Sequence, residues 1–226
     1  MTSSSSYEIG VVCPTRNRLD RAIDLYRSLK ATSGQARLLY YIDDDQKEAY
    51  APLETVAQDA GFLYGPKVGP CDSVNRLVAH FPEHTIYGVA PDDSLFLTQA
   101  WDQWLIDKFN SFPGRLGVVS PSHDLGDFVN FPFVSREWIE VLGWFAYPTA
   151  YHFIWDTVLE LLGDATRICY APGEKFSMKN LAMPPTDYEE CFQKDCQGFL
   201  WWSVGERKKM IVKMRAAMTA QGAVFP

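Results

Sequence analysis

The chain alternates short apolar segments with amphipathic helical segments, and this alternation constrains its fold more than any other feature. Apolar runs at residues 9–12, 36–42, 62–65 and 85–90 have the composition of buried strands. Apolar residues at helical spacing follow three of these strands and predict three helices. The first covers 17–34, with Asn17 as its cap, and the third covers 71–81. The second has Pro52 in its first turn and Gly61 at its end. Strands that alternate with helices predict a parallel sheet covered on both faces.

The second half of the chain is less regular. Its pattern predicts helices at 99–109, 136–142 and 156–162, and strands at 117–120, 128–134 and 167–171. One hydrophobic core is enough for 226 residues. We expect a single domain over 8–200, preceded by a disordered Ser-rich tail at 1–7 and followed at 201–226 by a basic amphipathic helix packed on the domain.

The composition narrows the class of protein. No apolar run approaches the roughly 20 residues of a membrane-spanning helix, and the start MTSSSSYEIG lacks the regions of a signal peptide, so we expect a cytoplasmic protein. The net charge of -7 argues against tight, nonspecific nucleic-acid binding as the main activity. The five cysteines stand in mostly apolar settings and are expected to be reduced, structural thiols.

Polar loops follow three of the predicted strands, at 14–18, 43–45 and 91–94. In open α/β sheets ligands bind outside the carboxyl ends of the strands, so these loops would open on one edge. Asp92 and Asp93 are adjacent there, and neighbouring carboxylates repel unless a cation or hydrogen-bond donors offset them. A Mg²⁺ or Mn²⁺ ion that also binds a diphosphate would do so. The alternative is that the pair only forms a turn.

Four short motifs occur in an order that resembles a known family. VVCPTRNR, YIDDDQ, VGPCDSVNRLV and YGVAPDDSLF, the last followed by AWDQW, are similar to the signatures of family-2-like glycosyltransferases of the GT-A fold, especially short bacterial and phage members with an Asp-Asp metal motif. The likeness extends from about residue 8 to 190. It implies an α/β, Rossmann-like fold whose mostly parallel central sheet is flanked by helices. Residues 8–97 would form the nucleotide-sugar half and 98–200 a less regular acceptor half.

The resemblance also implies an activity and a set of site residues. A sugar would move from a nucleoside-diphosphate sugar, with UDP the expected nucleotide, to an acceptor hydroxyl, with inversion and an Asp as general base. By position in the motifs, the nucleotide-sugar contacts would be Pro14, Thr15, Arg16, Asp43, Asp44, Asn75, Asp92 and Lys179. Asp93 would hold Mn²⁺ or Mg²⁺, Asp92 would approach the ribose, and an Asp of the 43–44 pair would contact the base.

Three acids are candidates for the catalytic base. Asp156, in HFIWDTVLELLG, stands at a predicted helix start beyond the metal motif, which is where the resemblance implies the base. Trp155 beside it could raise its pKa by desolvation. Asp156 is also a good helix N-cap, and Asp124 and Asp127 in SHDLGDF are the alternatives.

The chain departs from the resemblance at one point. Many relatives carry a late His as a third protein ligand of the metal, and the corresponding stretch here, YAPGEKFSMKNL, contains none. Either the metal rests on fewer protein ligands, or Lys175 or Lys179 meets the diphosphate as a fixed positive charge. The sequence leaves metal dependence open.

Two other classes of function compete with glycosyl transfer. A nucleotidyltransferase usually begins with a Gly-rich loop that VVCPTRNR lacks, and a degenerate nucleotide-sugar-binding module is compatible with the missing His. The acceptor could be a glycan, a protein or a hydroxymethylated pyrimidine in phage-type DNA. The acidic charge counts against DNA, although the tail offers a basic patch: Arg207, Lys208, Lys209, Lys213 and Arg215. The sequence does not set the oligomeric state.

Overall fold

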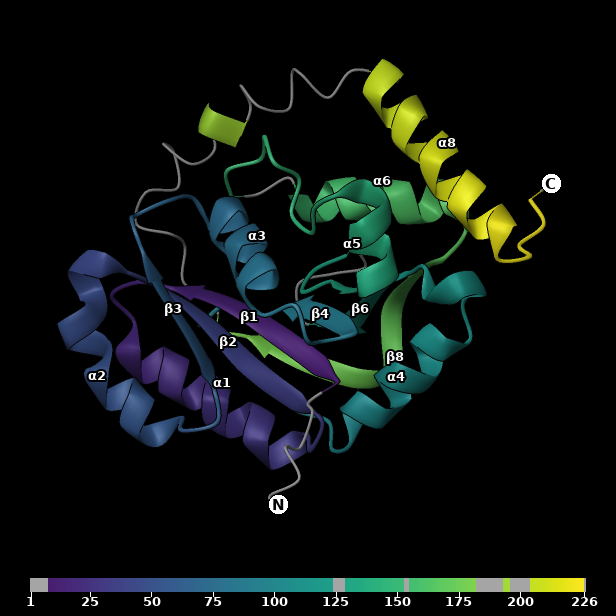
Figure 1. The fold of residues 1–226 in the computed structure, drawn as a ribbon. Coiled ribbons are helices and arrows are strands. Elements are labelled where there is room, and N and C mark those ends of the chain that lie inside the picture. Colours follow the sequence, from purple (N-terminus) through teal and green to yellow (C-terminus); the bar gives the residue numbers. More distant parts are fainter. Residues whose placement is uncertain (1–7, 124–128, 153–154, 182–192, 196–203, 226) are drawn as a thin grey trace.

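A computed structural model describes residues 8–123, 129–152, 155–181, 193–195 and 204–225. These residues form a sheet with the strand order β3-β2-β1-β4-β7-β6-β8-β5 (Figure 1). The strands are β1 Ile9–Thr15, β2 Ala36–Asp43, β3 Gly61–Gly65, β4 Ile86–Val89, β5 Ser94–Phe96, β6 Val118–Ser122, β7 Phe133–Ser135 and β8 Cys169–Asn180.

The direction of the strands confirms the mostly parallel sheet expected from the sequence. β1 pairs in parallel with β2 and β4, and β2 pairs in parallel with β3. β7 runs antiparallel between β4 and β6, and β6 is parallel to β8. β1, β2, β3, β4, β6 and β8 therefore point the same way, and their carboxyl ends lie along one edge of the sheet.

Helices cover both faces of this sheet. They are α1 Leu19–Thr32, α2 Lys47–Val56, α3 Pro70–His80, α4 Trp101–Asn110, α5 Arg136–Leu142, α6 Trp155–Thr166 and α8 Val204–Ala220. Figure 1 shows α1 and α2 on one face and α3, α5 and α6 on the other. None of the helices in the described part of the chain is long and apolar enough to cross a membrane.

Side-chain alternation in the central strands builds a core on each face. Ile9 and Val11 of β1 pack in the cluster that contains Leu25 of α1, whereas Val12 packs in the cluster that contains Leu77 of α3. All of these side chains are fully buried. Burial of each such aliphatic side chain is worth about 1.5–3 kcal/mol, so both helical layers are held to the sheet by apolar contacts.

Several boundaries expected from the sequence are wrong. A 3-10 turn at Asp44–Gln46 leads directly into α2, which begins at Lys47 and therefore has Pro52 in its interior rather than in its first turn. Gly61 starts β3 instead of ending the helix. Asn17 does not cap α1, because it has a φ of 58° and Arg18 is the N-cap residue.

The last two strands also differ from their predicted bounds. β7 is confined to Phe133–Ser135, because only these residues pair with β4, and Phe131 before it has a φ of 51°. β8 extends to Asn180, well past the predicted end at residue 171, because its last residues pair antiparallel with β5. The stretch YAPGEKFSMKNL, which lacks the late His, is therefore mostly strand.

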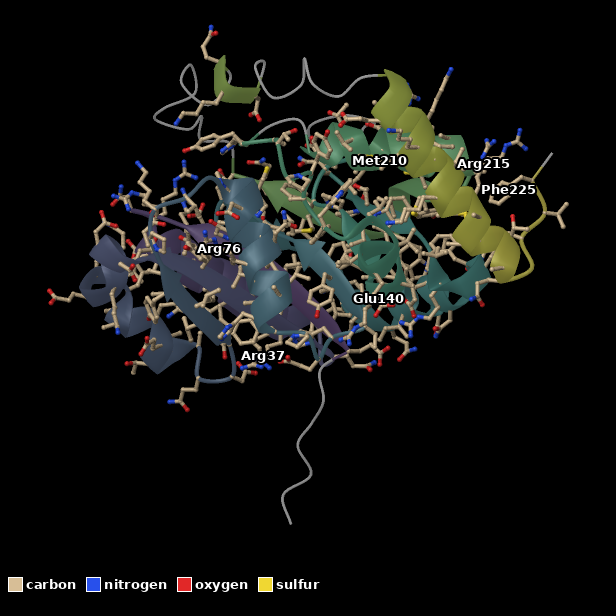
Figure 2. All side chains as sticks on the ribbon, turned by 45° about the horizontal axis from the view of Figure 1, so that its top comes forward. Arg37, Arg76, Glu140, Met210, Arg215 and Phe225 are labelled. Carbon is tan, nitrogen blue, oxygen red and sulfur yellow. The ribbon has the colours of Figure 1, made fainter. Side chains whose placement is uncertain are left out.

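The basic C-terminal helix α8 packs on α5 and α6. Met214 and Met218 are fully buried in the same cluster as Trp138 of α5 and Leu159 of α6. Figure 2 shows Arg215 of α8 close to Phe225. The Arg215 guanidinium lies 5.5 Å from the centre of that ring and donates a hydrogen bond of 2.9 Å to the carbonyl of Ala165.

Asp102 at the start of α4 ties this helix to the loop between α1 and β2. Its Oδ2 accepts hydrogen bonds from Ser33 Oγ at 2.7 Å and from the backbone N–H groups of Gly34 and Gln35 at 2.8 Å. Its Oδ1 accepts one from Gln103 N at 2.9 Å. Burial alone would raise the pKa of Asp102, but these hydrogen bonds outweigh it and lower the pKa.

We expect Asp102→Ala to lower the free energy of unfolding by about 3 kcal/mol, because the buried donors around it lose a charged acceptor. Because the pKa is lower in the folded protein, this contribution is present above the unfolded value of 3.8 and is lost as the pH falls through the folded value. Urea denaturation across pH 7 to 3 measures both effects. Asp107→Ala, an exposed position on the same helix, is the control, and an equal loss in both variants would contradict the prediction.

Candidate functional site

The loops after β1, β2 and β4 meet at the carboxyl edge of the sheet, as the sequence predicts. Side chains of the 14–18 loop reach acids of both other loops: Arg16 contacts Asp43, and Arg18 contacts Asp92 and Asp93. β1 lies between β2 and β4, so its loop is the natural link between the two acidic loops. Pro14, which is half-buried, and Thr15 are the last two residues of β1, so of residues 14–18 only 16–18 lie in the loop itself.

Thr15 and Tyr50 hold one side of Asp92. Thr15 Oγ1 donates to Asp92 Oδ2 at 2.8 Å and lies 2.8 Å from Tyr50 Oη. Tyr50 Oη also accepts the backbone N–H of Arg18 at 3.0 Å. Because the Thr15 proton points to the carboxylate, the Tyr50 hydroxyl is the donor to Thr15. The result is a directed chain of hydrogen bonds from Tyr50 through Thr15 to Asp92.

Arg18 holds the other side of the acidic pair. Its Nη1 lies 3.1 Å from Asp92 Oδ1 and 3.2 Å from Asp93 Oδ2. Both acids are nearly buried, with whole-residue exposed fractions of 5% for Asp92 and 8% for Asp93. Burial raises the pKa of Asp92, hydrogen bonds from Thr15 and Arg18 oppose this rise, and the charge of Asp93 adds to it.

A second arginine organises the loop after β2. Arg16 Nη1 donates to Asp43 Oδ2 at 2.7 Å, and its two terminal nitrogens form a fork on Asp45, each at 2.6 Å. The hydrogen bond to Arg16 lowers the pKa of Asp45. Asp43 is buried, whereas Asp44 and Asp45 are exposed. The sequence pointed to Asp43 and Asp44 and missed Asp45, although it stands in the same DDD run.

Asn75 binds the backbone of the second half. Its amide oxygen accepts from the N–H groups of Phe145 and Ala146, both at 3.0 Å, and its amide nitrogen donates to the Ala146 carbonyl at 2.7 Å. Three hydrogen bonds to one short segment fasten residues 145–146 against α3. These hydrogen bonds of the Asn75 side chain are thus all to the protein's own backbone.

Asp156 lies in the first turn of α6, where the sequence places it. Its Oδ1 accepts the backbone N–H of Thr157 at 2.7 Å. Burial raises its pKa to about 7, in spite of the hydrogen bonds from Thr157, which lower it. A carboxyl group with this pKa is present in both protonation states at neutral pH.

A buried acid that the sequence did not single out, Asp195, fixes the loop before α6. One of its oxygens accepts the N–H of Tyr151 at 2.6 Å, and the N–H of His152 lies 3.0 and 3.1 Å from the two oxygens. The Tyr151 ring packs so closely on Gly69 that a Cβ there would come within 2.6 Å of it. The Tyr151 carbonyl accepts the N–H of Cys71 at 3.4 Å.

These contacts place the start of α6 relative to the sheet. α3 directly follows β3, so its first residues, around Gly69 and Cys71, lie at the carboxyl edge. Tyr151, four residues before α6, packs on this helix start. Burial raises the pKa of the Cys71 thiol, and the charges of Asp195 and Asp156 add to the rise. Asp156 and Asp195 are thus at the same edge of the sheet as Asp92 and Asp93.

The end of β8 lies beside the acidic pair. The backbone N–H of Leu181 donates to the Asp93 carbonyl at 2.6 Å, and Asn180 pairs with Ser94. Lys179 pairs with Leu95 and is exposed. Asp124, Asp127 and the side chains of Trp155 and Lys175 lie outside the described residues.

The acidic pair fits a divalent cation that arrives with a diphosphate. In the described part of the chain, no three His, Cys, Asp or Glu side chains gather as a ligand set. However, one oxygen of Asp92 and one of Asp93 already converge on a single cationic nitrogen, that of Arg18. Mg²⁺ bound by one or two carboxylates takes its other ligands from phosphate oxygens and water, so the pair supplies what such an ion needs from the protein.

Comparisons with solved structures identify the class of fold as GT-A, which confirms the fold expected from the sequence. Residues 1–349 of S. aureus TarS align with a TM-score of 0.56 and 9% identity, over 94% of this chain and 72% of that one. Glucosyl-3-phosphoglycerate synthase from Mycobacterium tuberculosis, in a complex with Mn²⁺, UDP and glucosyl-3-phosphoglycerate, aligns with a TM-score of 0.57 and 15% identity, over 85% and 77%.

A third structure, M. tuberculosis Rv0371c in a complex with manganese, aligns with a TM-score of 0.50 and 14% identity, over 85% of this chain and 99% of that one. Identities this low show the fold alone. No protein-family model matches the chain, and a comparison with curated proteins finds no match.

Proposed function

We propose that the chain is a glycosyltransferase that moves a sugar from a nucleoside-diphosphate sugar, with UDP the expected nucleotide, to an acceptor hydroxyl. One observation carries this proposal: Asp92 and Asp93, at the carboxyl end of β4, turn one oxygen each toward a single cation position in a GT-A fold. Support comes from a structure of the same fold that contains Mn²⁺ and UDP.

The loops after β1 and β2 would bind the nucleotide. Asp43, held by Arg16, offers a carboxylate of fixed orientation to an N–H group of the base. Pro14 and Thr15 line the same side, and Asp92 faces the ribose. Asn75 contributes by holding residues 145–146, which border the nucleotide half.

Asp93 would hold the divalent ion, Mn²⁺ or Mg²⁺. When bound, this ion offsets the charge that develops on the leaving diphosphate. Lys179, exposed on the strand that ends beside Asp93, is the protein cation we assign to the same diphosphate.

Asp156 would be the general base that takes the proton of the acceptor hydroxyl. A pKa of about 7 suits this role, since a base works best when its pKa is near the operating pH. Asp195 keeps the adjoining loop in place through Tyr151 and His152. The acceptor itself would be a glycan, a protein or a hydroxymethylated pyrimidine in DNA.

A second candidate function is a nucleotide-sugar-binding module without catalysis. Two observations favour it. The guanidinium of Arg18 already occupies the cation position between the two acids, and the described residues contain no group of three metal-ligating side chains. The two candidates differ in turnover: an enzyme releases free nucleoside diphosphate from its donor, and a binding module does not.

Thermal-shift measurements with a panel of nucleoside-diphosphate sugars, each with Mn²⁺ and with chelator, test the proposal. At 100 times its dissociation constant a ligand stabilises the folded protein by about 2.7 kcal/mol, which for a chain of this size raises the melting temperature by about 5–10 °C. We expect this shift for one base only, and with Mn²⁺. The absence of a shift with every donor would overturn the proposed function, and a shift without release of nucleoside diphosphate would favour the binding module.

A further inference from the structure

We propose that Arg18 and the divalent cation compete for the same two carboxylates, so that the Arg18 side chain leaves Asp92 and Asp93 when the metal binds. Arg18 would thereby set the metal affinity of the empty site and couple metal binding to the arrival of a diphosphate. This inference rests on the proposed function.

The first argument is position. A single nitrogen, Nη1 of Arg18, contacts an oxygen of each acid, at 3.1 and 3.2 Å. The other oxygen of Asp92 is already engaged by Thr15, so the oxygen that faces Arg18 is the one left for a metal. A metal ion held by Asp92 would therefore need the oxygen that Arg18 now holds.

The second argument is charge. Asp92 and Asp93 together with Arg18 leave the cluster with one negative charge when both acids are ionised. A divalent ion added to an unchanged cluster would place two cations side by side in a nearly buried site, where like charges are poorly screened. Departure of the guanidinium removes this repulsion, while in the absence of metal the guanidinium keeps the two carboxylates from facing each other unpaired.

The third argument is that the Arg18 side chain can move toward solvent. Its backbone is fixed, because its N–H donates to Tyr50 Oη and the residue is the N-cap of α1. Its side chain is the most exposed of the cluster, at 26% against 7% for Asp92 and 11% for Asp93. The side chain can rotate about this fixed point without disturbing the fold.

The fourth argument is that a diphosphate is a suitable new partner. A cation near the start of a helix is unfavourable unless an anion lies beside it, and Arg18 now has Asp92 and Asp93 for that purpose. A diphosphate brought by the metal supplies the same anionic charge and accepts the planar guanidinium through two oxygens. The exchange therefore leaves every charged group paired.

Arg16 provides a matched contrast within the same loop. Its guanidinium is held by three hydrogen bonds to Asp43 and Asp45 and has none to Asp92 or Asp93 in the described contacts. Removal of the Arg16 charge alters the electrostatic potential nearby but opens no metal ligand. Arg16→Gln thus separates direct competition from a general effect of charge.

The experiment is a titration of the nucleotide-free protein with Mn²⁺, by calorimetry or by the electron-spin-resonance signal of free Mn²⁺. We expect Arg18→Gln to bind Mn²⁺ about tenfold or more tightly than the wild type, because the two charge-assisted hydrogen bonds no longer have to be broken. Arg16→Gln should change this affinity less than about threefold. Arg18→Lys keeps the charge but makes fewer hydrogen bonds, so its Mn²⁺ affinity should lie between those of the wild type and Arg18→Gln. It replaces Arg18→Gln in the test if the glutamine variant does not fold.

A second titration in saturating UDP separates this inference from the proposed function. In the presence of UDP we expect the Mn²⁺ affinity of the wild type to approach that of Arg18→Gln. The guanidinium that leaves the two acids can then bind the diphosphate instead. The competition alone would be overturned if both Arg18 variants, free of nucleotide, bind Mn²⁺ no more tightly than the wild type does, while the wild type still binds Mn²⁺ together with UDP. If no variant binds Mn²⁺ with or without UDP, the competition and the metal role of Asp93 both fail.

Discussion

Asp156→Asn should keep the affinity for the donor and slow sugar transfer by about 10²–10⁴-fold, which is the usual contribution of a general base. Asparagine has nearly the same shape and can still accept the N–H of Thr157 through its amide oxygen, so α6 should start as before. It cannot take up a proton from the acceptor. The donor dissociation constant and the rate of nucleoside diphosphate release, measured on the same preparation, check both parts.

The pH dependence gives this prediction a second test. Because burial raises the pKa of Asp156 to about 7, the basic form becomes scarce below that pH. The rate should therefore rise about tenfold per pH unit up to about pH 7 and then level off. Donor binding should not follow this profile.

The same pKa shift also predicts an effect on stability: the raised pKa that suits a general base destabilises the folded protein at neutral pH. An acid whose pKa is higher in the folded protein holds its proton more tightly there, so stability falls as the pH rises from the unfolded value of 3.8 to about 7. Asp156→Asn removes this penalty, and it should unfold at higher temperature than the wild type at pH 8 and at a similar temperature at pH 4. A gain in stability with loss of turnover is expected when the replaced functional group destabilises the fold.

Asp164→Asn is the matched control, since Asp164 is an exposed acid on the same helix. It should change neither turnover nor the pH profile. Full turnover of Asp156→Asn would refute the assignment and move the base to Asp124 or Asp127.

The position of the acidic loops at this edge of the sheet could be predicted because the sequence patterns that indicate the strands and helices are local. Apolar alternation and helical spacing arise within each segment, and a parallel sheet then brings the loops at 14–18, 43–45 and 91–94 together whatever their side chains. For this reason the convergence of the acidic loops could be predicted, while the partner of each acid could not.

Specific partners depend on contacts between distant residues. Arg18 lies 74 residues from Asp92, Tyr50 lies 35 residues from Thr15, and Asp195 lies 44 residues from Tyr151. No spacing rule connects such pairs. Arg18 stands at the start of the helix predicted from the sequence, and its place between the two acids follows from the tertiary structure.

The length of β8 illustrates how tertiary pairing overrides local preference. The stretch PGEKFSMKN contains Pro, Gly and charged residues that disfavour strands, yet β8 continues through it to Asn180. Its end pairs with β5, which begins directly after Asp93. A strand that is stabilised by its neighbours on both sides leaves little signal in its own sequence.

Asp93→Ala should weaken Mn²⁺-dependent donor binding by at least about 100-fold, because one of the two charged ligands of a nearly buried site is lost. Asp92 cannot compensate, since its second oxygen is engaged by Thr15. The fold should tolerate the change: the alanine removes a like charge beside Asp92 and should lower the pKa of that neighbour, which the Asp93 charge now helps to raise. Calorimetric titration with a UDP-sugar, with Mn²⁺ and with chelator, measures the effect.

In chelator the wild type and Asp93→Ala should bind the donor equally weakly, so the difference between them isolates the metal contribution. Asp72→Ala, which removes an exposed acid paired with Arg76 on α3, should behave as the wild type in both conditions. If Asp93→Ala retains full affinity in Mn²⁺, the acidic pair has no metal role. Arg18 would then be the permanent cation of this site rather than an occupant that metal displaces.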